Sequence, residues 1–388
     1  MEQPKNKKLP APKENLIAQI KAAGLCAPES MTLMVTDGCN LRCRHCWHDC
    51  GTLEKATPVP TSKILKLIRE FAQIGGTRLT LTGGEILSHP NWYALLAYCS
   101  EHPRIDSVCL QTNATLIARE HIQALLCLRL DKLTIQVSLD GAKARTHNFV
   151  RGLGSYTRTM AGLHLLVEAG LGLQTQVAFT EMAHNLEELP ELLEKIDKMG
   201  IGRLVSGTLV DGGRARAATH INLPTPAQYW ELIDFYHSDA AFRALYDQKA
   251  NIAAIEWYKN RSKHSDGGCS CLKNLFVDTR GHLYPCTMLL LDQYAMDKVY
   301  SRPLHRTIAL ALSKWAEIPI LSRNRPRMVP SCSRCTYKDH CGGGCMGRAA
   351  AVSGELMTPE DRCSLRKAVY SWTQLPSVAS FCRKSCAQ

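Results

Sequence analysis

Between residues 31 and 209, short apolar runs alternate with longer segments whose apolar residues recur every three or four positions. The short runs are typical of buried strands, and the longer period is typical of amphipathic helices. Strands that alternate with helices in this way form a parallel sheet with right-handed crossovers. The predicted strands are residues 31–36, 78–82, 107–112, 133–139, 173–179 and 203–209.

Helices are expected between these strands, and glycines follow several of them, as at Gly75, Gly170 and Gly200. Six strand–helix units fall short of the eight that close a barrel. The predicted fold class is therefore α/β, a partial (β/α)6 TIM-type barrel whose chemistry lies at the carboxyl ends of its strands. The expected helices are residues 14–23, 62–75, 91–102, 118–128, 155–170 and 186–200.

The alternation stops after residue 210, and the composition changes. From residue 269 onward the chain is rich in Cys and Gly, with short elements. Such a region is expected to be held by metal rather than by a large apolar core. The predicted parts are a basic tail with a short helix at 1–30, the partial barrel at 31–224, a helical linker at 225–268, a Cys-rich domain at 269–365 and a tail at 366–388.

The chain has 18 cysteines, and its basic, Pro-rich N-terminus lacks the apolar core of a secretion signal. We therefore expect a cytoplasmic, reducing location, where clustered thiols bind metal rather than form disulfides. The sequence contains no apolar run of about eighteen residues, so it predicts no membrane span. The formal charge of +12 omits the negative charge of metal-bound thiolates. Without an RNA-binding aromatic motif or an Arg-rich helix, that charge does not favour a nucleic-acid partner.

The first cysteine group, in 39-CNLRCRHCW-47, directly follows the first predicted strand. Thiolates select soft metals, chiefly zinc or iron–sulfur clusters. The spacing C-x3-C-x2-C of Cys39, Cys43 and Cys46 is not the C-x2-C pairing of zinc ribbons. Three thiolates on a four-iron cluster would leave one iron open to a ligand, whereas a fourth thiolate from Cys50 would close the site.

This group resembles the signature of the radical S-adenosylmethionine (SAM) enzymes, and further matches stand in order at the following strand ends: 82-TGGE-85, 111-QTNATL-116, 138-SLDG-141 and 150-VRG-152. The resemblance implies a SAM-binding [4Fe–4S] cluster on the three cysteines. It also implies SAM contacts from Gly83, Gly84, Glu85, Asn113, Ser138, Asp140 and Arg151.

In this resemblance, Glu85 and nearby backbone carbonyls would hold the amino group of SAM, because a carboxylate and carbonyls suit an ammonium group. Arg151 would pair with the SAM carboxylate, Ser138 would face the ribose or carboxylate, and Asp140 the ribose or substrate. The structural alternatives are a turn Asn, a helix-capping Asp and a surface Arg. The stretch 212-GGRARA-217 resembles one found in relatives and would either border this pocket or form a Gly-rich turn.

The implied chemistry is one-electron chemistry. The reduced cluster would donate an electron to SAM, and the resulting 5′-deoxyadenosyl radical would take a hydrogen atom from the substrate. The protein's part is to orient these groups and exclude side reactions. A non-catalytic iron–sulfur electron carrier is the alternative, but a carrier does not need a SAM pocket.

The second cysteine group reads C-x9-G-x4-C from Cys271 to Cys286, then C-x2-C-x5-C-x3-C from Cys332, then Cys363. These spacings resemble the SPASM extension of many radical SAM enzymes. The resemblance implies two auxiliary [4Fe–4S] clusters, three clusters in all. The first would be held by Cys269, Cys271, Cys286 and Cys345, and the second by Cys332, Cys335, Cys341 and Cys363. If Cys269 does not bind, the first auxiliary cluster has an open iron.

The resemblance specifies the class of enzyme and leaves the substrate open. Sulfatase-maturing relatives carry a catalytic Asp where this chain has Thr287, and Thr is a poor base. Tyr284 is the candidate proton or radical relay, with packing in a hairpin as the alternative. About thirty residues precede the first strand, fewer than a leader-binding domain needs, so leader binding would require a separate protein. Relatives that trim haem precursors share this layout.

We therefore predict a radical SAM maturase that oxidatively modifies a peptide or protein side chain, for example by a crosslink or thioether. The alternative is oxidation or decarboxylation of a small metabolite such as a tetrapyrrole. Either activity implies an external electron donor of the flavodoxin or ferredoxin type. Cys99, Cys109 and Cys127 are expected as small buried hydrophobes, and Cys382 and Cys386 form a C-x3-C pair of open role.

Overall fold

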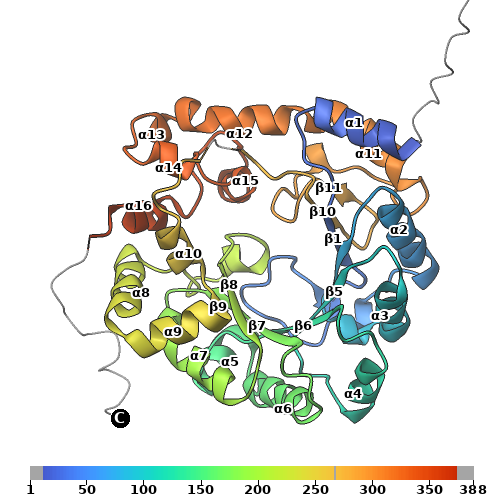
Figure 1. Cartoon of the computed structure of the whole chain (residues 1–388), viewed down its shortest axis with the longest axis horizontal. Coiled ribbons are helices and arrows are strands. Elements are labelled where there is room, and N and C mark those ends of the chain that lie inside the picture. The colour runs from blue at the N-terminus through green and yellow to red at the C-terminus, as the bar shows by residue number, and fades with distance from the viewer. Residues whose placement is uncertain (1–11, 266–267, 374–388) are drawn as a thin grey trace, which may run out of the picture.

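The fold was determined as a computed structural model that describes residues 12–265 and 268–373. All six predicted strands are present, and they form the parallel centre of one sheet: β1 (Ser30–Met34), β4 (Arg78–Thr82), β5 (Ser107–Thr112), β6 (Leu133–Ser138), β7 (Thr175–Glu181) and β8 (Arg203–Thr208). They neighbour one another in chain order. Figure 1 shows the sheet curving around the centre of the molecule with helices outside it. The α/β fold class is therefore confirmed.

The helices that follow these strands cover the outer side of the sheet: α2 (Thr61–Gln73), α3 (Trp92–Glu101), α4 (Arg119–Leu126), α6 (Ser155–Glu168) and α7 (Leu189–Lys198). All five were expected, as was α1 (Pro12–Ala22). The short helix α5 (Ala144–Arg151) was not, because two turns of mostly polar residues leave little periodic signal.

The strands bury alternate residues, such as Leu79 and Leu81 of β4 and Val108 and Leu110 of β5. These side chains share one hydrophobic core with the inner faces of the helices, as Phe71 of α2 illustrates. The residues between them are only partly buried and face the other side of the sheet. The main core therefore lies between sheet and helices, and the inner side of the sheet is free to form a polar cavity.

Three more strands extend the sheet, so that its order is β11-β10-β1-β4-β5-β6-β7-β8-β9. β10 (Asn274–Val277) pairs in parallel with β1, and β11 (Leu283–Tyr284) forms an antiparallel hairpin with β10. At the opposite edge, β9 (Ala250–Asn251) pairs with β8. A strand from the Cys-rich region thus lies beside the first strand of the chain.

The remaining helices belong to the second half of the chain: α8 (Pro226–Ser238), α9 (Ala240–Lys249), α10 (Ala253–Lys259), α11 (Leu304–Trp315), α12 (Glu317–Met328), α13 (Pro330–Ser333), α14 (Lys338–Cys341), α15 (Met346–Ser353) and α16 (Cys363–Ser371). Trp315 and Val369 in this region are fully buried and belong to the main hydrophobic core. The Cys-rich region therefore shares the main hydrophobic core with the barrel, whereas its composition predicted a region held by metal rather than by a large apolar core. Within the described ranges, every helix is too short or too polar to cross a membrane.

Candidate functional site

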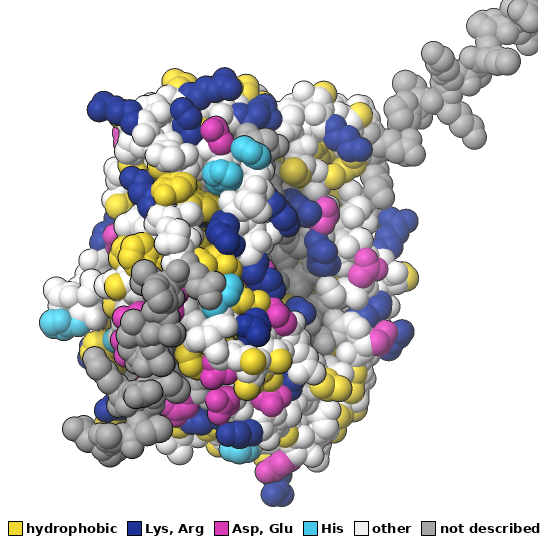
Figure 2. All heavy atoms as spheres, turned by 60° about the vertical axis from the view of Figure 1, so that its left-hand side comes forward, with side chains coloured by type: hydrophobic (Ala, Val, Ile, Leu, Met, Phe, Trp, Pro, Cys, Tyr) yellow, Lys and Arg dark blue, Asp and Glu magenta, His cyan; other side chains and the backbone are white. Residues whose placement is uncertain are grey.

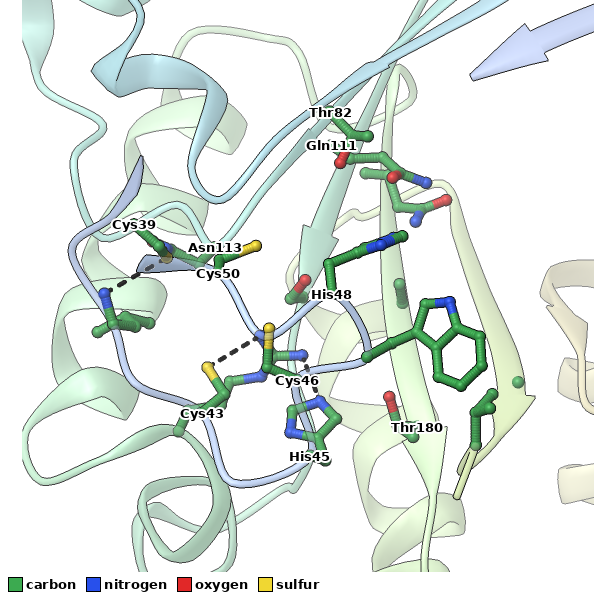
Figure 3. Close-up of a pocket in the computed structure, with 18 of the residues that line it drawn as sticks. Cys39, Cys43, His45, Cys46, His48, Cys50, Thr82, Gln111, Asn113 and Thr180 are labelled. Carbon is green, nitrogen blue, oxygen red and sulfur yellow. Dashed lines mark hydrogen bonds between the residues drawn. The ribbon is translucent and has the colours of Figure 1, made fainter. Parts of the chain in front are cut away.

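The loops at the carboxyl ends of β1, β4, β5 and β6 meet around a cavity of about 530 Å³ (Figure 3). The sequence places its motifs in these loops, and the fold brings the loops together because parallel strands end at one edge. The predicted residues that line this cavity are Cys39, Cys43, Cys46, Gly83, Gly84, Asn113, Ser138 and Arg151. Glu85 and Asp140 were also predicted, but they lie buried behind its wall, at 1% and 0% exposure.

The two glycines of 82-TGGE-85 allow the loop after β4 to touch the backbone of the cysteine loop. The amide of Gly84 donates to the carbonyl of Thr36 at 2.8 Å, and the amide of Glu85 donates to that of Gly38 at 2.8 Å. A Cβ atom at position 84 would lie 2.2 Å from the Gly38 oxygen, and one at position 83 would lie 2.6 Å from the Thr36 oxygen. Only glycine permits this close approach.

The Glu85 carboxylate accepts hydrogen bonds from the amide of Leu87 at 3.1 Å, the hydroxyl of Thr112 at 2.7 Å and the amide of Asn113 at 2.8 Å. Burial raises its pKa, although these hydrogen bonds and the charge of Arg151 oppose the rise. In this structure the carboxylate therefore joins the loops after β4 and β5, behind the cavity wall.

Asn113 connects the loop after β5 to the first cysteine. Its Nδ2 donates to Oδ1 of Asn40 at 2.9 Å and lies 3.9 Å from Sγ of Cys39. Its Oδ1 accepts from both the amide and the hydroxyl of Thr115, which fixes the orientation of the amide group. Asn113 is 6% exposed and thus forms part of the wall beside Cys39 (Figure 3).

Asp140 and Arg151 form a buried ion pair in which Nε donates to Oδ2 at 2.6 Å. The other oxygen of Asp140 accepts from the amide of Thr180 at 2.8 Å. Burial alone would raise the pKa of Asp140, but the charges of Arg151 and His45 outweigh it and lower this pKa to about 2. Arg151 also lies 4.0 Å from Sγ of Cys43, so the pair connects β6 to the cysteine loop.

Arg214 of 212-GGRARA-217 holds the cysteine loop from the opposite side. Its guanidinium donates to the carbonyls of Cys43 at 2.9 Å and Cys50 at 2.8 Å, and to Asp49 at 2.8 Å. Added Cβ atoms would meet the Trp47 ring at 2.1 Å from position 212 and the Cys46 carbonyl at 2.3 Å from position 213. The motif therefore borders the pocket, as one of its two interpretations proposed, and its glycines permit close packing.

Cys50 lines the same cavity and is 5% exposed. A hydrogen bond from its thiol lowers the pKa of Cys46, although burial opposes this shift. By contrast, burial raises the pKa of Cys39 to about 12. Four thiols thus face one cavity, and the structure is compatible with either three or four of them as ligands.

The eight cysteines of the second group also gather around cavities. Cys269, Cys271, Cys286 and Cys345 line one of about 350 Å³. Cys332, Cys335, Cys341 and Cys363 line a smaller one, and Cys341 touches both. The fold thus brings Cys345 to a set whose other members lie 59 or more residues earlier, and Cys363 to a set that ends 22 residues earlier.

The chemistry of these donor sets fits iron–sulfur clusters. In the described ranges no three Cys, His, Asp or Glu side chains are close enough to hold a single metal ion. A four-iron cluster instead spreads four thiolates around its own volume, which matches four thiols around a cavity.

Tyr284 does not line the main cavity. It is 4% exposed on β11, with its ring centroid 6.0 Å from that of Phe276, and belongs to a small apolar cluster with Met34 and Cys50. Burial raises the pKa of its phenol. Its surroundings match those of a hairpin-packing residue adjacent to the cysteine loop.

Of the incidental cysteines, Cys99 is buried and Cys109 is partly buried, but Cys127 is exposed. The expectation that Cys127 is buried was wrong, because Ile122 and Leu125 turn the buried face of α4 away from it. Cys382 and Cys386 lie outside the described residues.

Sequence reasoning also missed Trp47, Gln111 and Gln136 as cavity-lining residues. The one available signal for the two glutamines was that each is a polar residue next to a buried apolar residue of a predicted strand.

The chain is similar in sequence and in fold to proteins that are already known. Residues 33–196 match the Radical SAM superfamily. The chain is 28% identical to the AdoMet-dependent heme synthase of Methanosarcina barkeri, covering 88% of this chain and 97% of that protein. It is 26% identical to the mycofactocin maturase MftC of Mycobacterium tuberculosis, covering 91% and 87%. The fold resembles that of anSMEcpe solved with AdoMet and the Cp18Cys peptide, with a TM-score of 0.68 at 18% identity over 88% of this chain and 96% of that one.

Proposed function

We propose that this chain, an enzyme that contains a radical SAM domain, oxidatively modifies a side chain of a peptide or protein. Cys39, Cys43 and Cys46 would hold the [4Fe–4S] cluster that binds SAM, and the two auxiliary sets would hold one cluster each, three in all. When bound, SAM and the first cluster supply a radical that removes a hydrogen atom from the substrate. The rest of the chemistry concerns what the residues around the cavity bind and exclude.

The observation that carries the peptide proposal is the uncharged floor of the main cavity. Gln111, Gln136 and Gln176 lie in register on three adjacent strands. Nε2 of Gln176 donates to Oε1 of Gln136 at 2.8 Å, which leaves the amide hydrogens of Gln136 for another acceptor. Gln111 and Gln136 line the cavity, and Gln111 lies beside Thr82 on the side away from Cys43 (Figure 3). An amide donates and accepts at once, as a peptide bond does.

The charged groups of this wall already have partners. Arg151 pairs with Asp140, and Arg214 pairs with Asp49 and two carbonyls. Burial lowers the pKa values of His45 and His48 to about 4, so both are neutral at pH 7. Each cationic side chain among the described lining residues therefore already has a partner. The carboxylates of a carboxylate-rich substrate would be buried here without a cation, which is unfavourable.

A second candidate is oxidation or decarboxylation of a small metabolite such as a tetrapyrrole. It is favoured by the similarity to the heme synthase of Methanosarcina barkeri, which spans 97% of that protein. In both cases the enzyme would work in the cytoplasm with an external electron donor of the flavodoxin or ferredoxin type. Peptide modification would additionally allow for a separate leader-binding protein.

The test is mass spectrometry of candidate substrates after anaerobic turnover with SAM and dithionite. The candidates are short peptides encoded beside the gene and a porphyrin precursor with four carboxylates. We expect a two-hydrogen mass loss from a peptide and no change in the porphyrin. Conversion of the porphyrin alone would overturn the peptide proposal. No 5′-deoxyadenosine above a triple Cys39, Cys43 and Cys46→Ala control would refute the radical chemistry itself.

The role of the cavity floor has its own test. Gln136→Glu keeps the shape of the side chain and adds a negative charge beside Gln111. The carboxylate cannot donate the hydrogen bond that the amide of Gln136 would give to the peptide. Because the loss of a hydrogen bond that involves a charged group costs about 1.5–3 kcal/mol, peptide conversion should fall about ten- to a hundredfold. Formation of 5′-deoxyadenosine without substrate should change less than about twofold. Gln123→Glu makes the same change on the exposed side of α4 and should have no effect.

A further inference from the structure

The positive charge of the chain is concentrated in the region that carries the second auxiliary cysteine set. Residues 302–338 contain eight Lys and Arg and one Glu, a surplus of seven positive charges in a chain whose total is +12. This segment comprises α11, α12 and α13 and ends at the start of α14. Metal-bound thiolates offset part of this net charge. Because these cysteines are buried or partly buried, their thiolates do not form ion pairs with Lys and Arg side chains that point into solvent.

We define a group of exposed residues on α12, directly after α13 and on α16 as the basic face: Ile320, Arg323, Arg327, Met328, Arg334 and Lys367. The α12 residues Ile320, Arg323 and Arg327 are spaced i, i+3 and i+7, so they share one side of the helix. Among the described residues, none of the three arginines or Lys367 has an ion-pair partner, since each lies beyond 4.0 Å of any carboxylate. Figure 2 shows Lys and Arg side chains gathered at the upper edge of the molecule, over α12 and α13.

Exposed apolar side chains lie among these charges. Ile320 is 53% exposed and Met328 is 64% exposed. Met and Arg are enriched at protein–protein interfaces. The basic face has no exposed aromatic ring on which a nucleic-acid base could stack. Its composition therefore favours an acidic protein as the partner over a nucleic acid.

The basic face is fixed to the cysteine set behind it. Arg325, on the inner side of α12, is fully buried and donates to the carbonyls of Gly343 at 2.9 Å and Thr358 at 2.8 Å. Arg334 stands between Cys332 and Cys335 in the sequence. Lys367 lines the same small cavity as the four cysteines. A protein that contacts the Arg334 and Lys367 end of this surface would therefore lie next to that set.

We infer that the basic face docks an acidic protein that carries one electron, and that the electron enters the chain at the set Cys332, Cys335, Cys341 and Cys363. The inference rests on the proposed function, because it requires a cluster on these cysteines. One electron leaves the reduced carrier and enters the chain, and the carrier departs oxidised by one electron. Charge complementarity accelerates such encounters and weakens with salt.

The test compares two reductants in the reconstituted enzyme. The triple variant Arg323→Glu, Arg327→Glu and Arg334→Glu should form 5′-deoxyadenosine at least tenfold more slowly when a purified acidic flavodoxin, kept reduced by its NADPH-dependent reductase, supplies electrons at about 50 mM salt. With dithionite, which needs no docking surface, its rate should stay within twofold of the wild type. The wild-type rate with flavodoxin should fall as salt rises, whereas the variant's rate should not.

The matched control is Arg119→Glu, Arg145→Glu and Arg158→Glu, which makes the same change of charge at exposed positions on α4, α5 and α6. The inference is overturned if this control slows as much as the test variant, if the test variant keeps the wild-type rate with flavodoxin, or if it slows equally with dithionite. The inference would also be overturned if the wild type bound an RNA probe and the test variant did not, while the two had the same rate with flavodoxin. Failure of the wild type with dithionite would instead refute the proposed function.

Discussion

Arg348 joins the barrel to the Cys-rich region through its guanidinium group. It lies on α15 and is 3% exposed. Its guanidinium pairs with Asp361 through two contacts, Nε to Oδ1 at 2.7 Å and Nη2 to Oδ2 at 2.6 Å. It also donates to the carbonyls of Thr208 at 3.2 Å and Leu209, at the carboxyl end of β8. Replacing it with Ala removes all four contacts.

The cost of Arg348→Ala follows from burial. Asp361 has a side chain only 6% exposed and would keep its charge without a partner. Removing one member of a buried ion pair costs about 3–5 kcal/mol. With an unfolding entropy of about 2.1 cal/mol/K per residue, the whole chain unfolds with about 0.8 kcal/mol/K, so Tm should fall by about 4–6 °C.

The assay is anaerobic calorimetry on enzyme of matched iron content. The control is Arg129→Ala, which breaks the exposed pair with Asp131, whose side chains are 53% and 62% exposed. Exposed pairs contribute about 0–1 kcal/mol, so this control should lower Tm by about 1 °C or less. We also expect Arg348→Ala to reduce substrate conversion more than 5′-deoxyadenosine formation, because the hydrogen bonds of Arg348 among the described residues run to Asp361, Thr208 and Leu209 and not to the cysteine loop. A Tm within 1 °C of the wild type would contradict the reasoning.

Three further outcomes are expected. Gly84→Ala should lose about four iron atoms per chain, because a Cβ 2.2 Å from the Gly38 oxygen would displace the cysteine loop. The control Gly207→Ala, where an added Cβ has no atom within 4 Å, should keep its iron, and iron analysis of both variants checks this. The triple Cys39, Cys43 and Cys46→Ala variant should hold about eight iron atoms instead of about twelve and form no 5′-deoxyadenosine; twelve would refute the assignment of these ligands. Cys50→Ser should keep about twelve iron atoms and wild-type 5′-deoxyadenosine formation, and loss of four would show that Cys50 is a ligand.

Much of the candidate site could be read from the sequence because its residues lie in short motifs directly after strands. The motifs at Cys39, Gly83, Asn113 and Ser138 meet at one edge as soon as the strands are parallel and in chain order. Contacts within the site could not be read. Glu85 and Arg151 were assigned to SAM, yet their hydrogen bonds run to Asn113 and Asp140, which depend on how neighbouring loops pack.

The sequence alone determined the six central strands, the helices between them apart from α5, and the spacing of the cysteines, because periodicity and short-range motifs are local properties. Only the tertiary structure decided that β10 pairs with β1, which places the Cys-rich region against the barrel. It also decided the register that aligns Gln111 with Gln136 and the contact of Arg348 with β8. These pairings join residues far apart in the chain, and their stability depends on packing in the whole fold rather than on local propensity.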